Sequence, residues 1–227
     1  MPFSKDALSM PLTSRSFQSI TIILFGFYSL LSALRHFLLH SGIYDLGLFT
    51  QWSYLLGIGQ PWQPSSLTAY LKPALGDHLS LSLLSISPIL KLLPNAYVLL
   101  LIQSLGLSLL CALIYSSIAS KRDRGITKLI KLLAVSLNPF IFNSALNDFH
   151  PEVAFSFLGY LSLLQLREKN YSSALFLLSL FVLTKEAMAI FAICFAIYAL
   201  LCKQYRIALF VAPGALIYFK IASSIVD

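Results

Sequence analysis

The stretch FQSITIILFGFYSLLSALRHFLL, residues 17–39, decides the fold class of this chain. A helix needs about 20 apolar residues to cross a bilayer, and this run is also too long for the core of a cleavable signal peptide. The rest of the chain agrees, because 58% of its 227 residues are hydrophobic and only 11% are charged. Its mean hydropathy is +0.80. We predict an all-α, polytopic transmembrane helix bundle that forms a single domain over residues 1–227.

Further apolar runs follow the first and alternate with short polar breaks. They cover residues 95–120, 126–147, 153–166, 172–184, 187–202 and 207–226. With the first run they predict about seven spans, and Asn138-Pro139 is expected to kink the span at 126–147. Residues 172–202 are also compatible with one long tilted helix, which would bury Lys185 and Glu186 at mid-depth. No internal repeat is evident.

The net charge of +7 comes from short basic breaks between the apolar runs. These breaks contain Lys121, Arg122, Arg124, Lys128, Lys131, Arg167, Lys169, Lys203 and Arg206. Basic loops stay on the cytoplasmic side and meet anionic lipid headgroups, so we expect membrane lipid and no nucleic acid as a partner. The rule predicts an integral protein of the plasma membrane, with residues 1–16 in the cytoplasm and the C-terminus outside.

Residues 41–94 contain no clean span. Their many glycines, prolines and aromatic residues are typical of an ordered loop at the membrane interface. Residues 45–56 and 78–93 are predicted to form two short helices that lie on the outer membrane surface.

This topology brings five carboxylates to the non-cytoplasmic face. They are Asp45, Asp77, Asp148, Glu152 and Glu186. Carboxylates near hydrocarbon are costly unless they find partners or serve a site. The convergence is therefore the main functional indication of the sequence. The three cysteines suggest neither a disulfide framework nor a thiolate metal site, and no soluble catalytic signature such as a P-loop or HExxH is present.

Local architecture explains part of this pattern. Asp45 is interpreted either as the N-cap of the helix at 45–56 or as a general base in the first outer loop. Asp77 and His78 are interpreted as the N-cap and first turn of the next helix, or as substrate-binding residues if they face the same cavity as Asp45.

The densest polar cluster is Asn147-Asp148-Phe149-His150-Pro151-Glu152. Pro151 and Glu152 fit a helix start. Asp148 and His150 are left unexplained by this reading. They are candidates to hydrogen-bond a sugar or to hold a divalent cation, magnesium or manganese. Their spacing matches no zinc signature.

Lys185-Glu186 directly follows an apolar run. A snorkelling lysine and an interfacial glutamate would explain the pair. Alternatively, Lys185 neutralises a phosphate on a lipid-linked donor. Arg35, His36, His40 and Lys72, near the same face, are interpreted as interfacial.

These residues resemble, in order, the bacterial family called domain of unknown function 2079. The resemblance rests on Tyr44-Asp45-Leu46-Gly47, Gln51, Gly76-Asp77-His78, Gln103, Asn138-Pro139, Asp148-Phe149-His150-Pro151-Glu152 and Lys185-Glu186, and covers about residues 30–201. The family is similar in layout to C-type glycosyltransferases, which take sugars from polyprenyl-phosphate carriers. Members typically continue for several more spans, so the resemblance implies a shortened member or a fragment.

The resemblance implies roles for individual residues. Asp45 would be the catalytic base, Asp148 and His150 the second polar wall, and Lys185 the phosphate contact, with Asp77, His78, Glu152 and Glu186 binding substrate. We expect Asp45, Asp148, His150 and Lys185 to line one cavity. The rival hypotheses are a transporter or channel, which also carries intramembrane ionisable groups, and a membrane scaffold without chemistry.

Overall fold

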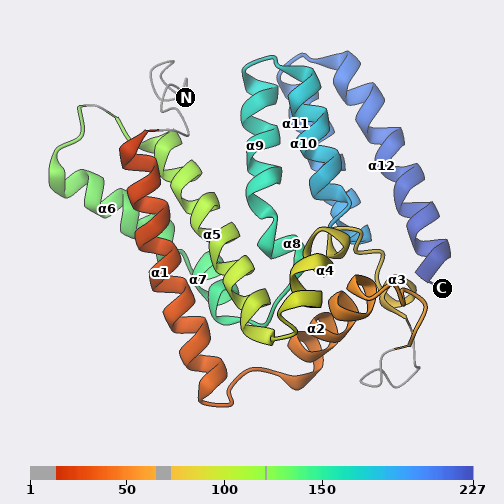
Figure 1. Ribbon diagram of the computed structural model, residues 1–227. Coiled ribbons are helices and arrows are strands. Elements are labelled where there is room, and N and C mark those ends of the chain that lie inside the picture. The colour runs from red at the N-terminus through yellow and green to blue at the C-terminus, as the bar shows by residue number, and fades with distance from the viewer. Residues whose placement is uncertain (1–13, 65–72, 121, 227) are drawn as a thin grey trace.

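The computed structural model describes residues 14–64, 73–120 and 122–226, which form helices and no β-strand (Figure 1). The all-α prediction is confirmed. Residues 1–13 of the expected cytoplasmic N-terminus, residues 65–72 of the expected outer loop and Lys121 lie outside the described part. The elements are α1 (Arg15–Phe37), α2 (Ile43–Gly57), α3 (Ala74–Asp77), α4 (Leu83–Leu92), α5 (Ala96–Ile118), α6 (Gly125–Ser136), α7 (Pro139–Leu146), α8 (Pro151–Ala154), α9 (Ser156–Arg167), α10 (Tyr171–Val182), the 3₁₀ turn η2 (Glu186–Met188), α11 (Ala189–Leu201) and α12 (Tyr205–Val226).

Three of the described helices are long and apolar enough to cross a membrane. They are α1, α5 and α12, with 23, 23 and 22 residues. At a rise of 1.5 Å per residue each is about 33–35 Å long, which matches the hydrocarbon core. α6 and α7 would form a fourth, broken span if they are counted together. The expectation of about seven spans is not confirmed, because the apolar runs that form α9, α10 and α11 give helices too short for the same test.

The predicted helix breaks occur where polar residues and proline interrupt the apolar runs. α6 and α7 meet at an angle of 55°, with Asn138 capping the second helix and Pro139 at its first position. α10 ends at Val182, and Lys185 is extended before η2 begins. The kink at Asn138-Pro139 is confirmed, and the interpretation of residues 172–202 as one long helix is wrong.

The region after α1 folds into short helices that pack at one end of α5. α2 and α4 lie against each other. The core between these two helices and α5 contains four fully buried side chains, Trp52, Leu83, Leu90 and Leu99. The first predicted helix corresponds to α2. The second is shorter than predicted, because it begins at Leu83, so neither is long enough to cross a membrane.

The capping interpretations in this region are wrong. α2 begins after Gly42, which places Asp45 in its first turn rather than at the N-cap. Asp77 is the last residue of α3, and His78 is extended, with φ −138° and ψ 134°. An aspartate considered alone favours the N-cap position, but in both cases the observed start of the helix lies a few residues away from the aspartate. No capping role therefore accounts for Asp45 or Asp77.

The hairpins α9–α10 and α11–α12 are built on the same turn. Lys169 and Lys203 each follow a helix in the left-handed conformation, with φ of 61° and 60°. In each case the next N–H bonds back into the last turn of the helix, at 2.9 Å and 2.8 Å, as in a Schellman motif. At one constant interval along the sequence, Glu152, Lys169, Tyr171 and Ala174 correspond to Glu186, Lys203, Tyr205 and Ala208. The two hairpins therefore share their turn and these four residue types at matching positions.

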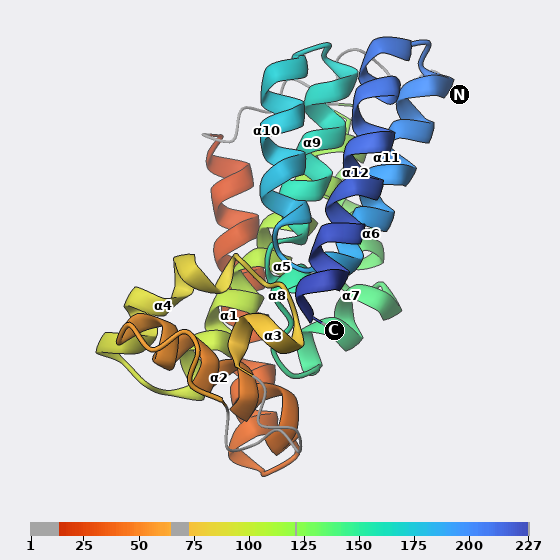
Figure 2. The same ribbon diagram turned by 90° about the vertical axis from the view of Figure 1, so that its right-hand side faces the viewer.

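Residues of opposite charge gather at opposite ends of the molecule. The turns after α5, α9 and α11 lie at the end drawn uppermost in Figures 1 and 2 and carry Arg122, Arg124, Lys169 and Lys203, and Arg206 lies in the first turn of α12 beside them. The elements α2, α3, α8 and η2 lie toward the opposite end. These elements and the turn before α8 hold Asp45, Asp77, Asp148, Glu152 and Glu186. The candidate functional residues therefore lie toward the same end of the molecule.

Candidate functional site

Asp148 connects the end of α1 and the segment after it to the turn before α8 through hydrogen bonds. Its Oδ1 accepts a hydrogen bond from Arg35 Nη1 at 2.9 Å, and its Oδ2 accepts one from the Gly42 backbone N–H at 2.7 Å. A Cβ at Gly42 would lie 2.6 Å from Oδ2, so only glycine allows this approach. The Asp148 side chain is about 10% exposed. A buried carboxylate is tolerated here because a cation and a backbone donor satisfy it.

Gln103 clamps the same turn from inside α5. Its amide Nε2 donates to the backbone carbonyls of Ser144, Asn147 and Asp148 at 2.9–3.2 Å. Its Oε1 accepts the His150 backbone N–H at 2.8 Å. Gln103 is only 2% exposed, so these bonds replace the water that the amide loses on burial. These bonds fix the backbone from Ser144 to His150.

His150 faces Asp45 across the site. Its Nδ1 lies 2.9 Å from the Asp148 carbonyl oxygen, which can only accept, so Nδ1 carries the proton. In the neutral ring, Nε2 then has a free lone pair. Nε2 lies 4.0 Å from Asp45 Oδ2, too far for a direct hydrogen bond. The Asp45 carboxylate and Nε2 of His150 therefore face each other without a direct hydrogen bond between them.

Two further ion pairs join the site to the break between α10 and α11. Lys185 Nζ lies 3.3 Å from Glu152 Oε1, with both side chains less than one-fifth exposed. His78 Nδ1 donates to Glu186 Oε1 at 2.9 Å, and the Leu79 N–H donates to Oε2 at 3.1 Å. Burial opposes ionisation of Glu186, but the hydrogen bonds from His78 and from backbone N–H groups outweigh it and lower the pKa of this carboxyl. η2 is thereby fastened to the segment that precedes α4.

The candidate residues form one connected group and two separate pairs. Asp45, Asp148 and His150 are connected through the turn before α8, whereas Glu152 with Lys185 and His78 with Glu186 form separate pairs. Asp77 ends α3 directly before His78. The three cavities described in this structure are lined by other residues. A single cavity shared by the first group and Lys185 remains a prediction.

The residues do not fit a resident divalent cation. Both carboxylate oxygens of Asp148 are engaged by Arg35 and Gly42, and Nδ1 of His150 is occupied by a carbonyl. Among the described residues, no group of three or more His, Cys, Asp or Glu side chains is arranged to hold a metal ion. A hard cation such as magnesium needs several oxygen ligands. We therefore assign no metal to Asp148 and His150.

Two residues matter more than the sequence suggested. Arg35 is the ion-pair partner of Asp148 rather than only an interfacial cation. Gln103 entered only through the family resemblance, yet it organises the turn that holds His150. A polar amide in the middle of an apolar span is itself a signal, because its burial requires partners.

Comparison with known proteins gives one match. A family model described as "Predicted membrane protein (DUF2079)" covers residues 35–226, and this range includes Arg35 and all the candidate residues above. Neither the curated proteins nor the solved structures give a match to the chain. The match spans most of the chain, so this protein belongs to the DUF2079 family of predicted membrane proteins.

Proposed function

We propose that this protein is a glycosyltransferase-like enzyme of C-type layout, which transfers a sugar from a polyprenyl-phosphate donor with Asp45 as general base. The observation that carries the proposal is the approach of Asp45 Oδ2 to His150 Nε2, at 4.0 Å. The Asp45 side chain is 48% exposed and the His150 side chain 27% exposed, so a substrate can reach both. Membership of the DUF2079 family supports a membrane protein. The proposed chemistry rests on Asp45 and His150.

The geometry suits an acceptor hydroxyl. An O–H can donate to the Asp45 carboxylate. In the neutral ring, Nε2 of His150 can accept a hydrogen bond from a second hydroxyl of the acceptor, because Nδ1–H donates to the Asp148 carbonyl. Asp148 cannot easily act as a base, since Arg35 and Gly42 hold both of its oxygens. We assign it the role of positioning His150. Holding catalytic groups in the reactive geometry before the substrate binds can lower a large part of the reaction barrier.

The proposed reaction is a displacement at the anomeric carbon. The acceptor oxygen forms a bond to this carbon, the bond to the donor phosphate breaks, and the acceptor proton passes to Asp45. Polyprenyl phosphate leaves with its electron pair. A carboxylate is a sufficient base because the acceptor O–H becomes acidic only as the new bond forms.

Lys185 is proposed to contact the donor phosphate. Its ammonium has three donors, so it can keep Glu152 at 3.3 Å and still bind a phosphate oxygen. The His78–Glu186 pair with Asp77 at the end of α3 would bind sugar hydroxyls from the neighbouring side. These assignments depend on the shared cavity that remains a prediction.

The reaction is proposed to occur at the non-cytoplasmic face of the plasma membrane. The positive-inside rule supports this orientation, because it assigns the basic turns after α5, α9 and α11 to the cytoplasm. A single cysteine at position 123, in a variant without the native cysteines, should stay unlabelled by an impermeant maleimide added to intact cells. Labelling from outside would invert the orientation.

The function is tested with membranes that contain the full chain and a radiolabelled polyprenyl-phosphate sugar. Asp45→Asn keeps the shape of the side chain but removes the base, so transfer should fall by about a hundredfold or more. Asp123→Asn is the matched control, since Asp123 pairs with Lys131 in the turn after α5. It should leave transfer unchanged. Equal transfer by wild type and Asp45→Asn, or no transfer by the wild type from any such donor, would overturn the proposal.

A further inference from the structure

A cavity of about 680 Å³ lies at the basic end of the molecule, where the turn after α9 and the turn after α11 lie side by side (Figures 1 and 2). Three cations line it, Lys169, Lys203 and Arg206, and no carboxylate does. The volume lies within the range of about 300–1,000 Å³ that is typical of small-molecule sites. A cavity with this charge suits an anionic ligand.

The two turns present the same residue types to the cavity. Lys169 and Lys203 are the two left-handed residues, and Tyr171 and Tyr205 begin the helices α10 and α12 that follow them. All four residues line the cavity. Gln204 fastens one turn to the other, because its Nε2 donates to a backbone carbonyl in the last turn of α9 at 3.2 Å. The cavity therefore has two similar halves, each with one lysine and one tyrosine.

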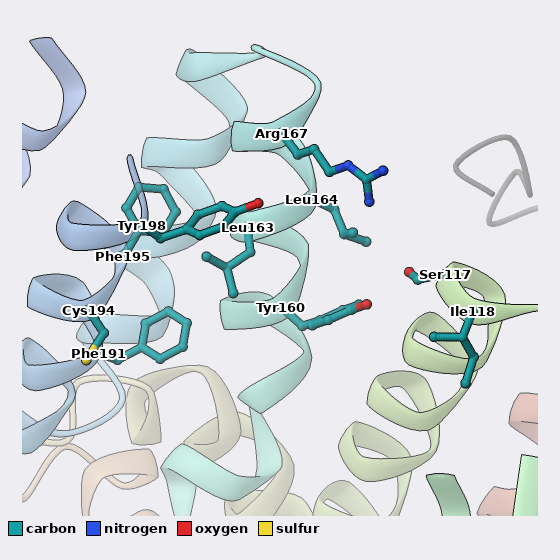
Figure 3. A pocket seen from close by; sticks show the side chains of 10 residues that line it. All are labelled: Ser117, Ile118, Tyr160, Leu163, Leu164, Arg167, Phe191, Cys194, Phe195 and Tyr198. Carbon is teal, nitrogen blue, oxygen red and sulfur yellow. The ribbon is translucent and has the colours of Figure 1, made fainter. Parts of the chain in front are cut away.

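The charges that line the cavity are not neutralised within the described part of the chain. None of its ion pairs involves Lys169, Lys203 or Arg206. Glu168 precedes the first of these lysines but does not line the cavity. Arg167 lines a separate hollow between α5, α9 and α11, and it already takes part in another interaction (Figure 3). The ligand must therefore satisfy three cations and no more.

The cavity lies where a lipid-facing helix begins. α12 starts at Tyr205 and is one of the helices long and apolar enough to cross a membrane, but only 17% of its apolar window is buried. Leu209 and Phe210, about one turn into this helix, are 73% and 69% exposed. Such side chains are stable against acyl chains, so the cations just before them lie at the level of the lipid headgroups.

We propose that this cavity binds the headgroup of one anionic phospholipid that carries two phosphates, with its acyl chains along the exposed face of α12. Each lysine–tyrosine half offers an ammonium and a phenol O–H to phosphate oxygens, and the guanidinium of Arg206 matches two such oxygens. Two phosphates bring two negative charges to three cations. A zwitterionic headgroup brings a cation of its own, which the three cations repel.

The apolar face of α12 decides between a lipid and a soluble diphosphate. Both carry the same two charges, but only the lipid also covers Leu209 and Phe210. Basic pockets at the cytoplasmic ends of membrane helices suit anionic headgroups for the same reason. The inference is independent of the proposed transferase activity, because the cavity shares no residue with the Asp45–His150 site.

Lipid binding is measured by native mass spectrometry on the full chain in detergent, with diphosphatidylglycerol, phosphatidylglycerol or phosphatidylcholine added. The wild type should retain one diphosphatidylglycerol in clear preference to the other two lipids. Lys169→Gln and Lys203→Gln should each weaken its binding about fivefold, and the double variant about twenty-five-fold. Lys203→Arg keeps the charge and should keep the binding.

Lys128→Gln is the matched control, because Lys128 is an exposed lysine of α6 that does not line the cavity. It should change the binding by less than about twofold. A loss as large as that of Lys203→Gln would mean a diffuse basic surface instead of a site. Equal retention of phosphatidylglycerol and diphosphatidylglycerol by the wild type would refute the headgroup with two phosphates.

A second measurement uses a native thiol in the cavity wall. Cys202 is exposed and lines the cavity, whereas Cys111 is buried, so a Cys194→Ser background leaves one accessible thiol. Diphosphatidylglycerol should slow the alkylation of Cys202 severalfold, and Lys203→Gln should remove most of this protection. Equal protection by inorganic diphosphate would identify a soluble ligand and refute the lipid. Unchanged alkylation in the presence of diphosphatidylglycerol would place the lipid elsewhere and overturn the proposal.

Discussion

Gly106→Ala is expected to destabilise the protein, because α5 and α8 touch backbone to backbone at this position. A Cβ on Gly106 would lie 1.7 Å from the Ala154 carbonyl oxygen and 2.7 Å from its carbonyl carbon. These are main-chain atoms, so no side-chain rotation can relieve the overlap and the two helices must move apart. Overpacking typically costs about 1–3 kcal/mol, occasionally more. The better helix propensity of alanine returns up to about 1 kcal/mol.

The net loss should therefore be about 2 kcal/mol, with the overlap at the upper end of that range. For a chain of this size, such a loss lowers Tm by about 4–8 °C. The assay is thermal unfolding of the detergent-purified variant beside Gly26→Ala. Gly26 lies in another long helix, α1, and a Cβ there meets no atom within 4 Å. Gly26→Ala should be neutral or slightly stabilising. A Tm for Gly106→Ala at or above that of Gly26→Ala would refute the close contact between α5 and α8.

Two further predictions concern the polar network. Gln103→Met should cost about 2–4 kcal/mol, because it removes the hydrogen-bond partner of the part-buried His150 N–H and of the carbonyls that the amide serves. Gln165→Met, which loses one exposed hydrogen bond, should cost less than about 0.5 kcal/mol in the same unfolding assay. Glu186 has a lowered pKa in the folded state, since hydrogen bonds from His78 and backbone N–H groups outweigh burial, so its stabilising contribution is present at neutral pH and is lost below about pH 4.3. The unfolding temperature of Glu186→Gln should therefore depend less on pH between 3 and 6 than that of the wild type, and parallel curves would contradict this assignment.

The sequence predicted the helices well, and their membrane crossings less well. Apolar runs and their interruptions are local signals, so α1, α5 and α12 follow from composition, and the breaks at Asn138-Pro139 and Lys185 follow from proline and charge. Whether a helix crosses a bilayer depends on the number of residues that remain helical between its two ends. The runs at 153–166, 172–184 and 187–202 were predicted to be spans although each is shorter than about 20 residues, and the helices α9, α10 and α11 are shorter again.

The capping predictions failed for a different physical reason. A local preference favours Asp45 as an N-cap, but α2 begins just after Gly42, whose N–H is held by Asp148, a residue 106 positions further along the chain. Nothing in the sequence near Asp45 reveals that bond. Arg35 was likewise placed at the interface, because its carboxylate partner is equally distant in sequence. Long-range hydrogen bonds, rather than propensity, decided these positions.

Local electrostatics accounts for part of the acidic end without any function. Asp45, Glu152 and Glu186 each lie in the first turn of α2, α8 or η2, where the backbone dipoles favour negative charge. Glu152 and Glu186 also have cationic or imidazole partners, and a purely structural protein would need nothing more from them. Asp45 is different, since the nearest described ring nitrogen, Nε2 of His150, lies 4.0 Å from its Oδ2, beyond hydrogen-bond distance. Helix electrostatics gives no reason for this carboxylate to face an imidazole that the turn before α8 holds in place. Among the acidic residues at this end, Asp45 is therefore the one whose replacement distinguishes the hypothesis of a catalytic site from the hypothesis of purely structural charges.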